Sequence, residues 1–472
     1  MAIDLKTPHG VPNEAEGSGN GKYTKLFENL QGNILKGFAR KYMRLLFLNF
    51  EGEEQEVKQW IKGLKLTSTM DQLYASKYRK LSIKKGVKPH DGGLVMNFFL
   101  SAKGYEELGF DPKKLGRKQG NKIFQEGMNS KRSLKWLGDS PTKFEKGYKE
   151  EIHALLLLAD DDEQELIKKT EGIKSFLEGN GIAMVFVEEK GAALDNQKEH
   201  FGYKDGISNP RFISQDIEKE IVERTGADQW NPILPLKKIL IKDPFTDRND
   251  DNYGSFLVYR KLEQDVEGFD NKIAELAKEL VLTKAQKMKG VTAEEYAGAL
   301  AVGRFKDGTP LALSDTYENK MPNGDVPSPN NFTYENTDRK GRKCPFHAHI
   351  RKTNPRGQGL IPKRFITRRA IPYGKPNDSN KKGLLFMCFQ SNLRAQFVFL
   401  QKAWANNPAF PRPKTGIDPV IGAGKKVEQQ WPKTYNSKDK VDFYFGDFVT
   451  MRGGEYFFAP SIGFLNKIDT IK

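Results

Sequence analysis

Residues 44–50 (RLLFLNF) form an apolar run of strand length, and a segment with helical periodicity follows directly. In residues 51–64, Val57, Trp60, Ile61 and Leu64 recur at intervals of three and four, which predicts an amphipathic helix. A strand joined to a helix by a short connection is the basic unit of folds in which a sheet is covered by helices.

The same order of elements recurs along the chain. Further apolar runs of strand length cover residues 94–100, 152–158, 182–187, 255–260, 383–389 and 456–458, with a helix opening at residues 160–163 and helices at 265–282 and 393–404. This order predicts an α+β protein made of two related modules, each a mostly antiparallel sheet with helices on one face. We expect a flexible tail over residues 1–22, an N-terminal module over 23–215 and a C-terminal module over 216–472.

Composition narrows the class of protein. The net charge is +16, yet the lysines are scattered and no stretch interleaves arginine with aromatics, so we expect no nucleic-acid partner. No apolar run approaches the roughly 20 residues of a membrane span, so no membrane partner is expected. The first residues lack the apolar core of a signal peptide, which favours a cytoplasmic location, with export by another route left open. Cys344 and Cys388, the only cysteines, cannot make a disulfide framework.

Three short segments carry residues suited to chemistry. Residues 344–352 (CPFHAHIRK) hold two of the six histidines, residues 366–374 (ITRRAIPYG) hold two arginines, and residues 201–207 (FGYKDGI) hold an aspartate between glycines. A histidine, an arginine and an aspartate are the parts needed to hold a haem iron and cleave a peroxide bond. The residues alone do not choose between His347 and His349.

The three segments together resemble the dye-decolorizing (DyP-type) haem peroxidases. The shared patterns are Gly-Tyr-Lys-Asp-Gly at 202–206, Cys-Pro-Phe-x-Ala-His-x-Arg-Lys at 344–352 and Arg-x-x-Ile-Pro-Tyr-Gly at 368–374. Similar stretches occur in family order at 31–37, 254–262, 383–386 and 453–458, so the resemblance covers residues 30–465. It implies two ferredoxin-like modules arranged like a dimeric α+β barrel, with haem b (iron protoporphyrin IX) held mainly by the second module.

The resemblance also implies an activity. The expected enzyme reduces hydrogen peroxide through an oxyferryl intermediate and oxidises dyes, phenolics or similar aromatic reductants one electron at a time. His349 matches the axial iron ligand, whereas His347 occupies a position that the family does not require. Asp205 matches the distal aspartate, which must move a proton between the peroxide oxygens, and Arg368 matches the distal arginine, which stabilises developing negative charge.

Several supporting roles are less tightly specified. The resemblance places Leu384 and Phe386 on the peroxide side, and it makes Arg351 and Arg356 candidate contacts for the haem propionates. The axial histidine should donate a hydrogen bond to a carboxylate, for which Asp442 and Asp447 are the candidates. For bulky dyes, the resemblance implies electron transfer through a surface aromatic, with Tyr373 as the first candidate and Trp404 as the second.

Two other functions are kept as alternatives. One is a haem- or iron-handling protein of the same fold with little turnover. The other is a basic nucleic-acid-binding protein, and the net positive charge is the only feature that favours it.

Overall fold

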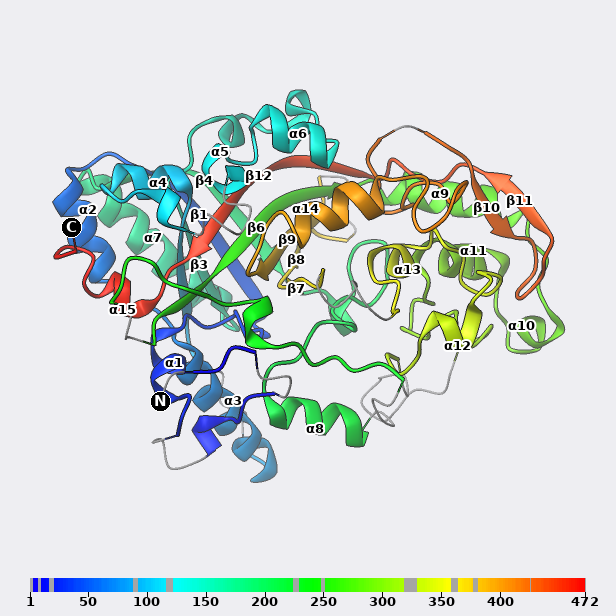
Figure 1. The fold of residues 1–472 in the computed structure, drawn as a ribbon, viewed down its shortest axis with the longest axis horizontal. Helices are drawn as coiled ribbons and strands as arrows, with labels where there is room; N and C mark the ends of the chain where they lie inside the picture. Colours follow the sequence, from blue (N-terminus) through cyan, green and yellow to red (C-terminus); the bar gives the residue numbers. More distant parts are fainter. Residues whose placement is uncertain are drawn as a thin grey trace.

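The computed structural model describes residues 3–6, 10–16, 21–87, 92–115, 122–223, 229–247, 251–317, 329–357, 364–376, 381–424 and 426–471. Its main feature is one ten-stranded antiparallel sheet, whose strands run through the centre of the molecule with helices on both sides (Figure 1). A two-stranded ribbon, β10 (Gln429–Pro432) with β11 (Lys440–Phe443), lies apart from this sheet.

The first module supplies four strands in the order β4-β1-β3-β2. This is the order of a ferredoxin-like fold, in which two strand–helix–strand units interleave. Strand β1, which lies between β4 and β3, is nearly all buried because both of its faces are covered. The strands are β1 (Tyr42–Phe50), β2 (Val95–Leu100), β3 (Ala154–Asp160) and β4 (Ala183–Ala192).

The second module repeats this order as β12-β6-β9-β7, with the short strand β8 also pairing with β9. The predicted pair of ferredoxin-like modules is therefore confirmed. The strands are β5 (Ile241–Lys242), β6 (Tyr253–Gln264), β7 (Thr367–Arg368), β8 (Ile371–Tyr373), β9 (Gly383–Gln390) and β12 (Val449–Ala459).

The two modules join into a closed barrel. Phe458 of β12 pairs with Leu100 of β2, which connects the strands of the two modules. At the opposite edges β4 lies against β8, where the side chain of Ile371 packs over Gly191. The barrel interior is filled by one face of the strands, including Phe47 and Tyr259, and the other face packs against the helices.

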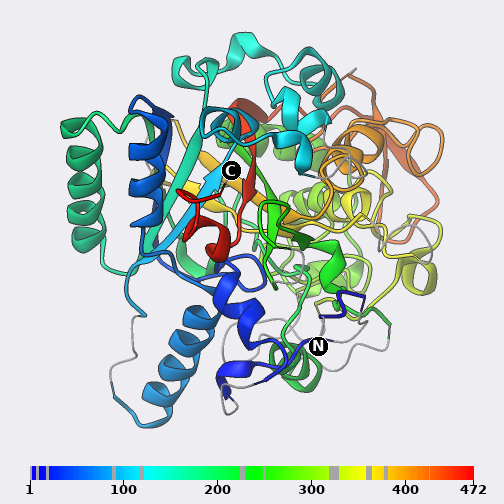
Figure 2. The same ribbon diagram turned by 60° about the vertical axis from the view of Figure 1, so that its left-hand side comes forward.

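Helices cover the outside of the barrel. In the first module α2 and α7 lie together against the sheet, and in the second module α9 and α11 pack on one another beside α13 (Figures 1 and 2). Longer helices begin at side-chain caps, as where Asp162 accepts hydrogen bonds from Gln164 and Glu165 at the start of α7. The α-helices are α1 (Thr24–Asn29), α2 (Glu54–Lys62), α3 (Thr69–Lys84), α4 (Ala102–Glu107), α5 (Lys122–Glu126), α6 (Lys131–Leu137), α7 (Glu163–Gly179), α8 (Ser214–Glu223), α9 (Val266–Ala277), α10 (Lys284–Met288), α11 (Ala293–Val302), α12 (Tyr334–Asp338), α13 (His349–Thr353), α14 (Phe397–Phe399) and α15 (Ile462–Leu465).

Two predicted segments differ in the structure. The described parts of the expected tail are packed: Val11 forms a bridge with Ile213, and Ala15 is 1% exposed. The high glycine and proline content gives no signal for these buried residues. The helix predicted over residues 393–404 is the short α14 followed by a π-helical segment, η8 (Leu400–Ala405).

The predicted module boundary at residue 215 falls within α8, in the connection between the modules.

Among the described residues, the helices are all too short or too polar to cross a bilayer.

Candidate active site

A cavity, here called the central cavity, lies against the outer face of β6 and β9 in the second module. Leu384 and Phe386 line it from β9, as their alternation on one strand face requires. The π-helical segment η8 lines another part of the wall, with Leu400 and Trp404. The exposed surface of the walls is mainly apolar, with charged and polar side chains set among the apolar ones.

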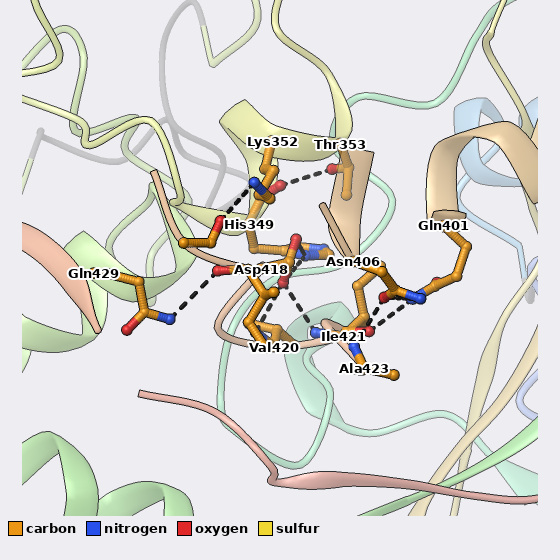
Figure 3. Close-up of polar contacts among 12 residues, drawn as sticks. His349, Lys352, Thr353, Gln401, Asn406, Asp418, Val420, Ile421, Ala423 and Gln429 are labelled. Atoms are coloured by element: carbon orange, nitrogen blue, oxygen red, sulfur yellow. Dashed lines mark hydrogen bonds and ion pairs between the residues drawn. The ribbon is translucent and has the colours of Figure 1, made fainter. Parts of the chain in front are cut away.

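His349 lines the central cavity from the first residue of α13. Its Nδ1 lies 2.9 Å from one carboxylate oxygen of Asp418 and 3.2 Å from the other (Figure 3). Because Nδ1 is engaged with a carboxylate, the imidazole is oriented and Nε2 is the nitrogen that can bind a metal. His347 does not reach the cavity; it is buried against the Trp431 ring, and burial lowers its pKa well below the usual value.

Asp418 is fully buried and held by backbone donors. Its Oδ1 accepts hydrogen bonds from Val420 N at 2.8 Å and Ile421 N at 2.9 Å. The candidates Asp442 and Asp447 were wrong, because Asp442 is an exposed residue of β11 and Asp447 pairs with Lys426 and Tyr444. No local pattern marks Asp418, which lies 69 residues after its histidine.

The loop that carries Asp205 is organised by Glu199. The Glu199 carboxylate accepts hydrogen bonds from the backbone of Phe201 and Tyr203, both at 2.9 Å, and burial raises its pKa. Gly202 and Gly206 have φ values of +89° and +77°, which glycine adopts without strain. The glycines of the motif therefore shape the turn that presents the aspartate to the central cavity.

Arg368 reaches the central cavity from β7, which pairs with β9 at Cys388. One of its terminal nitrogens lies 3.4 Å from Asp205 Oδ1, while its backbone is fixed by two hydrogen bonds with Asn209. The Arg368 Nε is buried and has no hydrogen-bond partner within the described part of the chain. The structure thus brings the predicted Asp205, Arg368 and His349 to one cavity.

Three further arginines, Arg304, Arg356 and Arg364, line the central cavity. Arg304 is 3% exposed, and its hydrogen bonds go to two carbonyls, a hydroxyl and a side-chain amide. Arg356 is 2% exposed and bonds Asn330 and Ser208, and Arg364 has a buried Nε without a partner among the described residues. Sequence reasoning found Arg356 and missed the other two, because neither lies in a recognisable motif.

Arg351 does not belong to this group. Its guanidinium bonds the carboxylate of Asp338 and the Cys344 carbonyl, and it lies outside the cavity lining. The prediction of a propionate contact was wrong because α13 turns Arg351 away from His349, toward a buried acid that already neutralises it.

The two aromatics expected at the surface are buried. Tyr373 is 7% exposed, with Lys261 Nζ 5.2 Å from its ring centre. Trp404 is 6% exposed, stacks on Phe410 and lines the central cavity. Neither ring is available for surface electron transfer, since the strand β8 and the segment η8 point them into the protein.

A second cavity, here called the adjoining cavity, meets the central cavity at Asp205 and Arg368 and has a volume of about 440 Å³. It is lined on its far sides by residues of both modules, among them Lys36 and Asp216, whose ion pair measures 2.6 Å. The charged residues that line both cavities, and so stand where the two cavities meet, are Asp205, Arg368, Glu199 and Lys204.

Comparison with known proteins agrees with this geometry. A family model described as "DyP dimeric alpha+beta barrel domain" matches residues 29–192, and one described as "Dyp-type peroxidase, C-terminal" matches residues 196–410. The multifunctional dye peroxidase DyP2 of Amycolatopsis sp. is 35% identical over 99% of this chain and 100% of its own length.

Solved structures give the same result. A DyP-type peroxidase from Anabaena sp. superimposes with a TM-score of 0.85 at 39% identity, covering 99% of this chain and 100% of the other. The structure of Amycolatopsis DyP2 has a TM-score of 0.85 at 34% identity, covering 98% and 100% of the two chains. The chain therefore belongs to the DyP-type peroxidase family and is a dye-decolorizing peroxidase, a haem-dependent oxidoreductase that acts on peroxide.

Proposed function

We propose that the central cavity holds haem b through His349, and that the enzyme uses it to reduce hydrogen peroxide and oxidise aromatic small molecules. The single observation that carries this proposal is that His349, Asp205 and Arg368, which are far apart in sequence, line one mainly apolar cavity.

The residues present suit a porphyrin with two carboxylates. The hydrogen bond from His349 Nδ1 to Asp418 leaves Nε2 for iron, and the apolar walls suit a flat hydrophobic ring. Arg304 is buried and Arg364 has a buried Nε, and neither has a carboxylate partner among the described residues, which is costly for a desolvated guanidinium. Together with Arg356 they are our candidates to bind the propionates, because guanidinium pairs well with carboxylate.

The bound haem would supply an iron that takes up peroxide and stores oxidising equivalents. The chain contributes the proton chemistry. The Asp418 carboxylate accepts a hydrogen bond from His349 Nδ1, which makes the imidazole a stronger electron donor. The Asp205 carboxylate takes a proton from one peroxide oxygen and returns it to the other, so that water can leave. The Arg368 guanidinium, 3.4 Å from Asp205, stabilises the negative charge that develops during cleavage.

Small aromatic reductants are our proposed electron donors. A relative, 26% identical over 94% of this chain, has been solved as a dye-decolorizing peroxidase complex with 2,6-dimethoxyphenol. The adjoining cavity offers a route for small molecules to Asp205 and Arg368, because these residues line both cavities.

Rapid mixing of the haem-loaded protein with peroxide tests this function. We expect a fast change in the haem spectrum that an aromatic reductant reverses, and in Arg368→Leu a rate constant lower by about 10²–10³-fold with haem still bound. A haem-handling protein would instead bind haem in both forms and show slow, equal reactions with peroxide.

A further inference from the structure

Lys352 is a buried cation on the helix that carries the axial histidine. It lies three residues after His349 in α13, and its side chain is completely buried. Its Nζ donates hydrogen bonds to the carbonyls of Asn407 at 3.0 Å, Phe410 at 2.6 Å and Gly416 at 2.7 Å. An ammonium has three donors, so all of them are used and none is left for solvent.

The three carbonyls belong to one loop, residues 407–418, here called the proximal loop. Its ends are drawn together by Gly416 N, which bonds Pro408 O at 2.9 Å, and its last residue is Asp418. Asp418 N bonds Ala405 O at 2.9 Å, which joins the end of the loop to η8. Lys352 therefore ties the helix of His349 to the loop that ends at Asp418 (Figure 3).

This connection between α13 and the proximal loop matters because His349 and Asp418 come from these two separate segments. The hydrogen bond between them depends on how the segments are placed. The carbonyls that Lys352 holds include Gly416, two residues before Asp418. Burial lowers the pKa of Lys352 to about 8, and the nearby Asp418 opposes this shift. The ammonium is thus retained at neutral pH, although its hydrogen-bonded partners are all uncharged carbonyls.

We propose that Lys352 is a positioning residue for the axial ligand: by fixing the proximal loop, it sets the hydrogen bond between Asp418 and His349 Nδ1 and so the electron donation from the imidazole to a bound metal. The proposal rests on His349 being the iron ligand, as proposed above. It extends that function to a residue that does not line the central cavity and whose hydrogen bonds go to the carbonyls of Asn407, Phe410 and Gly416.

The test compares Lys352→Met with a matched control, Lys261→Met. Methionine fills similar space without donors, and Lys261 is likewise buried but bonds Glu145 and Glu189 in the barrel interior. In the haem-free protein we expect amide hydrogen exchange in residues 407–421 to quicken at least tenfold in Lys352→Met and not in the control. In the ferrous haem-loaded protein we expect the iron–imidazole stretching band to move to lower frequency only in Lys352→Met.

A double variant separates positioning from general stabilisation. If Lys352 acts through Asp418, then Lys352→Met added to Asp418→Asn should shift the band no further, whereas a residue that only stabilises the fold would leave the two effects independent. Should Lys352→Met fail to fold, Lys352→Gln keeps two donors and should give a smaller shift in the same direction.

An unchanged band in the Lys352 variants, or an equal extra shift in the Asp418→Asn background, would overturn the inference. A wild-type protein without the band, or a band that survives His349→Ala, would instead overturn the assignment of the iron ligand.

Discussion

The two polar sides of the central cavity are built differently. On the His349 side, Asp418 is fully buried and accepts hydrogen bonds from two backbone amides as well as from the histidine. On the Asp205 side, the side chains of Arg368 and Asp205 are 29% and 36% exposed and lie 3.4 Å apart, and a guanidinium nitrogen has no partner among the described residues.

This difference matches two chemical tasks. A group that only holds and tunes a metal works best when its surroundings fix it, and the pair His349 and Asp418 has such surroundings. Groups that pass a proton to a small substrate must be reached by it and must have hydrogen-bonding capacity left. Asp205 and Arg368 stand at the opening between two cavities and retain that capacity.

The largest effect should come from removing the proton acceptor. We expect Asp205→Asn to lower kcat/KM for peroxide by about 10²–10⁴-fold, because general acid–base catalysis contributes on that scale. Haem binding should stay normal, because Asp205 is not among the residues that we expect to hold the haem. Steady-state kinetics with a small phenol, alongside the haem spectrum of the same sample, measure both. A loss of haem from Asp205→Asn would mean that this residue supports the fold of the cavity instead.

A smaller effect is expected on the fixed side. Asp418→Asn keeps the shape but removes the charge beside His349, and substitutions of such outer partners typically cost 10–100-fold in metal affinity or activity. We expect haem affinity to fall by about that factor, which titration of haem into apoprotein measures. Asp442→Asn is the matched control, because this exposed aspartate of β11 should leave haem affinity unchanged.

The last effect concerns the stability of the fold and not the reaction. Burial raises the pKa of Glu455, on β12, to about 7. The folded state then binds more protons than the unfolded state between pH 4.5 and 7, so the free energy of unfolding should fall as pH rises through this window, by at most about 3 kcal/mol.

Glu455→Gln should remove this contribution while its amide oxygen still accepts from Met128 and Tyr456. Urea unfolding at pH 5 and pH 8 compares the two proteins. Parallel losses of stability in both would show that another group titrates.

Much of the fold could be predicted from local patterns. The strand runs at residues 44–50 and 383–389 are long, apolar and bounded by polar segments, so β1 and β9 appear as predicted. The closure of the barrel was implied by the family resemblance and by no local pattern, because it depends on Ile371 meeting Gly191 across the fold. The short strands β7 and β8 are too brief to give a periodic signal.

The residues of the active site also fall into two groups, those that could be predicted from motifs and those that could not. The motifs led to Asp205, Arg368 and His349 because each stands in a distinctive short pattern. Asp418 and Arg304 were missed because a buried partner is selected by three-dimensional proximity and leaves no local trace. Tyr373 was expected at the surface because the family resemblance implies a surface aromatic and this residue lies five positions after Arg368, whereas strand β8 buries its ring in the barrel.

The central claim is that one imidazole, that of His349, holds the haem iron. The most direct measurement is the haem absorption spectrum of reconstituted protein in His349→Ala and in His347→Ala, a control two residues away that is buried against Trp431. We predict that the intense Soret band of ligated haem is lost in His349→Ala and kept in His347→Ala. A band that persists in His349→Ala and disappears in His347→Ala would contradict the account.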